Sequence, residues 1–79
     1  MTYICVPTEL WNTSLMPEGL LERWLVEDGA AVEAGDPVAC VRINENLHEI
    51  MAPVAGRVTA MSALNSMVDP GYAIAEVQV

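Results

Sequence analysis

The sequence predicts an all-β fold, a small sandwich or barrel built from short strands. Short apolar segments alternate with turn residues along the whole chain. An internal repeat points the same way, because residues 32–41 resemble residues 68–77 at an offset of 36 positions. The identical pairs are Val32 and Val68, Gly35 and Gly71, Ala39 and Ala75, and Val41 and Val77. Two copies are too few for a solenoid, so we expect two half-domains related by a pseudo-two-fold axis.

The first half is predicted to contain two strands separated by a surface loop. Tyr3–Val6 is rich in β-forming residues, whereas Thr8–Glu18 is polar, irregular and bordered by prolines. Leu20–Val26 fits both a strand and a one-sided helix. The glycines on either side leave room for only a short element, so we predict a strand.

A β-hairpin is predicted in the middle of the chain. Pro37–Ile43 and Leu47–Met51 form its strands, and Asn44-Glu45-Asn46 forms its turn. Asparagine tolerates the left-handed backbone angles that tight turns need. Arg57–Ala63 is the repeat partner of the earlier ambiguous segment and is also expected to be a strand.

Composition restricts the classes of function. The 79 residues predict one domain, residues 1–79, and the net charge of −8 disfavours nucleic-acid binding. No apolar run approaches the roughly 20 residues of a membrane span, and the start lacks signal-peptide features. We therefore expect a cytoplasmic domain without a membrane partner, in which Cys5 and Cys40 are free thiols.

Several motifs together resemble a lipoyl domain of the biotinyl/lipoyl attachment family. The first half of the match is Glu18-Gly19, Trp24-Leu25-Val26-Glu27-Asp28-Gly29, Val32 and Gly35-Asp36; the second half is Ala52-Pro53-Val54-Ala55-Gly56-Arg57-Val58 and residues 68–77. The resemblance runs from about Val6 to Val77. It implies a flattened barrel-sandwich hybrid of two four-stranded antiparallel sheets with pseudo-two-fold symmetry.

The resemblance also locates the position where such domains carry their cofactor. A lysine normally stands at the hairpin turn, four residues before an acidic residue; counting back from Glu49 gives Glu45. The chain contains no lysine at all, so neither lipoate nor biotin attachment is expected. The Trp24-Leu25 pair and the absence of the biotinyl Ala-Met-Lys-Met signature favour the lipoyl type. Trp24 is expected in the core.

The resulting hypothesis is a non-modified lipoyl-like domain that acts by protein–protein interaction. Its expected partners are subunits of a 2-oxo acid or acetoin dehydrogenase complex, or a lipoate ligase. The alternatives are a structural barrel module, a relict carrier domain, and a carrier that uses an unusual residue. One histidine offers no oriented set of nucleophile and base, so we do not expect an enzyme.

Five residues are candidates for partner binding. Asn44, Glu45 and Asn46 form the predicted turn, and Trp11 with Leu15 could form an apolar patch in the loop that precedes the second strand. Trp11 is predicted to be exposed. The turn could equally be a polar turn without a partner, and Leu15 could equally pack beneath the loop.

Two further groups are considered for chemistry. His48 and Glu49 are adjacent on a strand and should point to opposite faces, so we predict no metal site. Cys40 is expected at a solvent-facing strand position, but no nearby cation would activate its thiol. Cys5 is expected to be ordinary packing.

Overall fold

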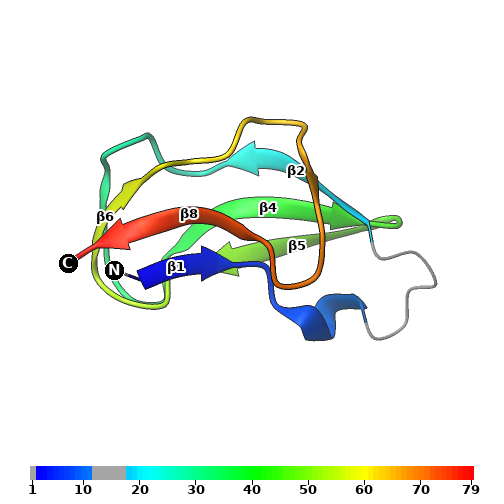
Figure 1. Cartoon of the computed structure of the whole chain (residues 1–79), viewed down its shortest axis with the longest axis horizontal. Helices are drawn as coiled ribbons and strands as arrows, with labels where there is room; N and C mark the ends of the chain where they lie inside the picture. Colours follow the sequence, from blue (N-terminus) through cyan, green and yellow to red (C-terminus); the bar gives the residue numbers. More distant parts are fainter. Residues whose placement is uncertain (1, 12–17) are drawn as a thin grey trace.

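The computed structural model of the chain describes residues 2–11 and 18–79. Within these residues it contains eight strands and one short 3-10 helix (Figure 1). The strands are β1 (Thr2–Cys5), β2 (Gly19–Trp24), β3 (Ala31–Val32), β4 (Pro37–Ile43), β5 (Asn46–Met51), β6 (Gly56–Thr59), β7 (Met67–Val68) and β8 (Ala73–Gln78). The 3-10 helix η1 spans Thr8–Trp11.

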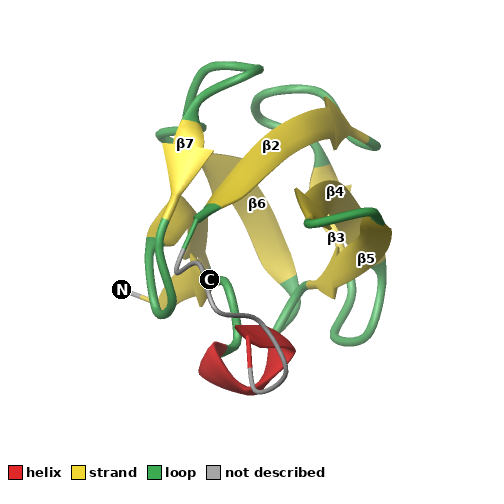
Figure 2. Cartoon of the chain, turned by 90° about the vertical axis from the view of Figure 1, so that its right-hand side faces the viewer, coloured by secondary structure: helices red, strands yellow, loops and turns green. Residues whose placement is uncertain are grey.

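The strands form two four-stranded antiparallel sheets. One has the order β1-β8-β6-β3 and the other the order β5-β4-β2-β7. Each sheet therefore takes strands from both halves of the chain, and the two sheets enclose the core (Figure 2). The predicted all-β, flattened barrel-sandwich with two four-stranded sheets is confirmed.

The internal repeat of the sequence corresponds to a repeat in the hydrogen bonding. Gly35 and Gly71 both have positive φ, at 90° and 81°, and each occupies the third position of a tight turn. The amide of Gly35 donates to the carbonyl of Ala52 at 2.9 Å, and that of Gly71 donates to the carbonyl of Val6 at 2.9 Å. The strand orders match when β1–β4 are exchanged with β5–β8. The two halves are thus related by a pseudo-two-fold axis.

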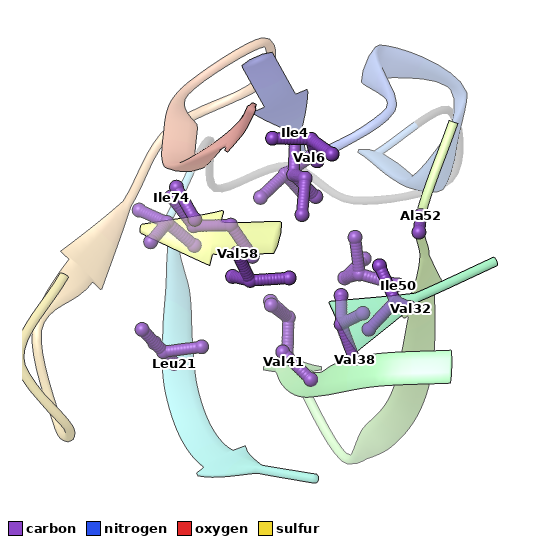
Figure 3. Close-up of a cluster of buried hydrophobic side chains, with 14 of the residues drawn as sticks. Ile4, Val6, Leu21, Val32, Val38, Val41, Ile50, Ala52, Val58 and Ile74 are labelled. Atoms are coloured by element: carbon purple, nitrogen blue, oxygen red, sulfur yellow. The ribbon is translucent and has the colours of Figure 1, made fainter. Parts of the chain in front are cut away.

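Aliphatic side chains from both sheets fill the interior (Figure 3). The largest fully buried ones are Ile4, Leu21, Ile43, Ile74, Val6, Val38, Val41, Val58, Val68 and Val77. No polar or charged residue is buried among the residues described. The core is therefore held by close packing of branched aliphatic side chains, with η1 and the connecting loops around it.

The five strands predicted by range are present with shifted ends, whereas β3, β7 and β8 were not predicted individually. The ambiguous segment is strand β2, which ends at Trp24, and β6 ends at Thr59 instead of continuing to Ala63. Trp24 is half-buried and packs against the core, and its indole N–H donates to the carbonyl of Ser62 at 2.9 Å. This bond connects the segment after β6 to β2, and β6 ends next to Ala60, whose φ of 54° departs from extended backbone. Across the residues described, no helix has the length and apolar character needed to span a membrane.

Candidate functional site

The β4–β5 hairpin carries the turn that the sequence singled out. Ile43 pairs with Asn46, so only Asn44 and Glu45 lie in the turn, and Asn46 is the first residue of β5. Asn44 has φ = 57°, a left-handed conformation that asparagine adopts at lower cost than most residues. The turn is one residue shorter than predicted, and all three side chains are exposed.

The hairpin presents this turn at one end of an elongated molecule. The turn lies at the end opposite both chain termini (Figure 1). Ile43, the last residue of β4, is only 2% exposed and anchors the end of the strand in the core. Because the anchor is buried and the turn is tight, the Glu45 carboxylate is displayed on a rigid support.

Trp11 does not form the exposed apolar patch that the sequence analysis proposed for partner binding, so its predicted exposure was wrong. It is 7% exposed, belongs to the core cluster, and donates its indole N–H to the carbonyl of Glu18 at 3.3 Å. Helix η1 turns the chain back toward the start of β2, where the absence of a Cβ atom on Gly19 leaves room for the indole. Leu15, the second predicted residue of this patch, lies outside the described residues.

His48 and Glu49 diverge, as the strand alternation predicts. His48 pairs with the fully buried Val41 and is half-buried, whereas Glu49 pairs with Cys40 and is exposed. Directly paired residues project to the same side of a sheet, so His48 and Glu49 face opposite sides. In the part of the chain that the structure describes, no three His, Cys, Asp or Glu side chains are grouped as a metal site requires.

The predicted exposures of the two cysteines were the reverse of those observed. Cys40 is 7% exposed, and Cys5 is exposed at the end of the edge strand β1. Cys40 projects from the outer face of its sheet, but it lies on the inner strand β4, between the cross-strand neighbours Arg23 and Glu49. An inner strand has a neighbour on each side, which agrees with the low exposure of Cys40.

Sequence reasoning also missed an ion pair close to the turn. The Nε atom of Arg42 lies 2.6 Å from Oε2 of Glu22, and its Nη2 lies 3.1 Å from Oε1. The hydrogen bond from Arg42 lowers the pKa of the Glu22 carboxyl, and the same bond raises the pKa of the guanidinium. The two residues are 20 positions apart and meet only through the register of β2 and β4, so no local motif could have revealed them.

Comparison with known families identifies this architecture. The Biotin_lipoyl family, described as biotin-requiring enzyme, matches residues 13–77. The chain belongs to this family. A biotinyl/lipoyl domain is a carrier domain by family and not a catalytic one, and the family normally carries covalently attached lipoate or biotin. No match was found among curated proteins.

The residues of this biotinyl/lipoyl domain do not fit that attachment chemistry. Both cofactors are joined through an amide, which needs a side-chain amine, and the sequence contains no lysine. The exposed turn offers a carboxylate at Glu45 and amides at its neighbours. A carboxylate and a cofactor carboxyl group cannot condense to an amide, so the turn can offer hydrogen bonds and negative charge only.

Proposed function

We propose that this biotinyl/lipoyl domain acts without a covalently attached cofactor and functions by docking on a protein partner through its β4–β5 turn. The observation that carries the proposal is the combination of an intact family fold and a rigidly supported turn with the absence of any lysine. Glu45, at the position that we assign to the attachment lysine, would supply a negative charge where carrier domains present their arm.

The proposed partners are components of a 2-oxo acid or acetoin dehydrogenase complex, or an enzyme that attaches lipoate. We infer that such partners contact the domain at the end that bears the β4–β5 turn. A domain that keeps this end but lacks the arm could occupy the partner's site as a scaffold or as a competitor. Family membership supports an enzyme partner in general, and the net charge of −8 favours a cationic surface on that partner.

The first test is the intact mass of the domain purified from its source cells. A mass equal to that of the unmodified chain is expected. A mass increased by one lipoyl or biotinyl group would contradict the proposal, because it would require an attachment site other than a lysine side chain.

The second test measures binding to a purified dehydrogenase component and to a purified lipoate ligase. Glu45→Gln should weaken binding by about fivefold, because an exposed charge contact contributes up to about 1 kcal/mol. Glu27→Gln removes the same charge from an exposed position in a different turn, between β2 and β3, and should leave the affinity unchanged. Equal affinities for the wild type and both variants would show that the turn is not the docking element.

A further inference from the structure

A row of side chains crosses all four strands of the β5-β4-β2-β7 sheet near the hairpin turn. Leu20 pairs with Met67 on one side and with Arg42 on the other, and Arg42 pairs with Leu47. Leu21 and Val41, the next residues in β2 and β4, are fully buried, so the row lies on the outer face. We call Leu20, Arg42, Leu47 and Met67 the outer row.

The outer row exposes two large apolar side chains. Met67 is 56% exposed and Leu47 is 53% exposed. They stand on β7 and β5, the two edge strands of the sheet. Leu20 is half-buried between them. The pseudo-two-fold axis provides an internal comparison, because it relates this row to Ala31, Arg57 and Gln78 in the other sheet. The equivalent positions of the other sheet thus hold a small residue and two polar residues, so the fold accepts non-apolar side chains where Leu20 and Met67 stand. The position equivalent to Leu47 lies outside the described residues.

Two hollows flank the Arg42–Glu22 ion pair on this face. One, of about 260 Å³, is lined by Glu18, Gly19, Leu20, Arg42, Asn44 and Met67, and so reaches the hairpin turn. The other, of about 240 Å³, is lined by Glu22, Arg23, Cys40 and Leu47. The larger hollow combines an apolar wall with the carboxylate of Glu18, a combination that suits a side chain with an aliphatic stem and a cationic end. In the smaller hollow the carboxylate of Glu22 is paired with Arg42 and stands beside Arg23.

Charge indicates what could cover this surface. The chain carries eleven acidic residues and three arginines. Arg42 is already paired with Glu22, and Arg57 donates to the carbonyl of Gly29. Arg23 is exposed and lines the smaller hollow, so the attraction for a cationic group is greater at the larger hollow. Two copies of a chain with a net charge of −8 would repel one another, so a second copy is a poor occupant. A partner with cationic and apolar side chains is complementary in both respects.

We propose that the outer row is a docking surface for a protein partner that presents lysine or arginine side chains next to aliphatic ones. This inference rests on the proposed function and extends it from the turn to the adjoining sheet face. Met67 and Leu47 supply the apolar contacts, and Glu18 receives the cationic group.

The test uses a synthetic peptide of alternating leucine and lysine as the probe and maps its binding by NMR amide shifts of the whole chain. The largest shifts are expected at the outer row. The double variant Met67→Ala/Leu47→Ala should weaken binding by about tenfold, which corresponds to about 1.4 kcal/mol. Tyr3→Ala removes a side chain of similar exposure, 52%, from the other sheet and serves as the matched control with unchanged affinity.

Three results would overturn this inference. The first is equal binding of a peptide in which serine replaces leucine, because the apolar contacts would then contribute nothing. The second is shifts spread over the whole acidic surface that disappear at about 0.15 M salt, as expected for screened, unspecific attraction. The third is self-association of the domain through this face, detected by sedimentation equilibrium.

The outcomes for the two proposals are separable. If the peptide avoids the outer row while Glu45→Gln still weakens docking of the dehydrogenase component, this inference fails and the proposed function stands. If Glu45→Gln does not change the affinity for the dehydrogenase component while Met67→Ala/Leu47→Ala lowers it, the partner docks on the sheet face and does not contact the turn.

Discussion

The indole of Trp11 packs so closely against the backbone of Gly19 that a Cβ atom on Gly19 would lie 3.0 Å from Cζ2 of Trp11. The same Cβ would lie 3.1 Å from Val68 and 3.2 Å from Val41. Helix η1, the start of β2 and the core therefore meet at a position that only glycine fills without displacing a neighbour. This contact attaches the long connection between β1 and β2 to the barrel.

Removal of this contact should destabilise the domain. We expect Trp11→Ala to lower the free energy of unfolding by about 3 kcal/mol, because a large buried side chain leaves a cavity. Gly19→Ala should lower it by about 1–2 kcal/mol through overpacking. Urea unfolding followed by far-ultraviolet circular dichroism measures both. As a control, Tyr3→Ala at an exposed position should change the free energy of unfolding by no more than about 0.5 kcal/mol. If Trp11→Ala changed it equally little, the indole would not contribute to the core.

Gly56 and Gly29 are needed for different reasons. At Gly56 the backbone of a neighbouring strand leaves no room for a side chain, whereas at Gly29 only the backbone conformation favours glycine. A Cβ atom on Gly56 would lie 2.4 Å from the carbonyl oxygen of Gln78, whereas one on Gly29 would meet nothing within 4 Å. Gly29 has φ = 84°, so its substitution costs only conformational strain, about 1–2 kcal/mol.

We therefore expect Gly56→Ala to lower the midpoint of thermal unfolding more than Gly29→Ala does. The physical reason is that β6 and β8 would have to separate locally to admit the methyl group. Circular dichroism melting curves of both variants decide the order. The reverse order would show that the β6–β8 pairing adapts easily.

The Glu22–Arg42 ion pair should make stability depend on pH. Its hydrogen bond lowers the pKa of Glu22 below the usual value of 4.5. Because the folded-state pKa is lowered, the stabilisation is present above the unfolded-state pKa and is lost as the pH falls through the folded-state pKa. Wild-type stability should therefore decrease more steeply below about pH 4.5 than that of Arg42→Met.

Urea unfolding midpoints between about pH 7 and about pH 3 measure this difference. Glu22→Gln removes the same titration and should follow Arg42→Met. Parallel curves for the wild type and both variants would contradict an energetic role for the ion pair. The carboxyl carbon shift of Glu22, followed by NMR, reports the lowered pKa directly in the wild type.

The two cysteines should differ in reactivity. Cys5 is exposed and Cys40 is 7% exposed, so an aromatic disulfide reagent should modify one thiol rapidly and the other slowly. Cys5→Ser should abolish the rapid phase, and Cys40→Ser should remove only the slow one. Two rapid phases would mean that the Cys40 thiol becomes accessible readily despite its low exposure.

Glu45→Lys tests whether the turn retains the geometry of an attachment site. Glu45 is exposed, so the substitution should not change the free energy of unfolding by more than about 0.5 kcal/mol. A purified lipoate ligase should then add one lipoyl group, detected by intact mass, and the wild type should remain unmodified. A folded but unmodified variant would show that recognition by the ligase was lost beyond the turn.

The sequence by itself determined the fold of this domain and the absence of a lysine at its hairpin turn. The repeat between residues 32–41 and 68–77 predicts two equivalent halves, and the structure contains them, with Gly35 and Gly71 in equivalent turns. Alternating short strands and turn residues are local signals, and the lack of lysine is a matter of composition. Neither the strand pattern nor the lysine content depends on contacts between residues that are distant in the sequence.

Only the tertiary structure decided which side chains are accessible. Trp11 lies in a polar loop, and nothing local shows that η1 brings it over Gly19. Cys40 and Cys5 both lie on strands, and their exposures differ because β4 is an inner strand and β1 is an edge strand.

The outer row is likewise invisible in the sequence. Leu20, Arg42, Leu47 and Met67 come from four different strands and are aligned only by the registers of three strand pairs. Only the Arg42–Leu47 pair belongs to the predicted hairpin, whereas Leu20 meets Arg42 and Met67 through pairing of strands that are distant in the sequence.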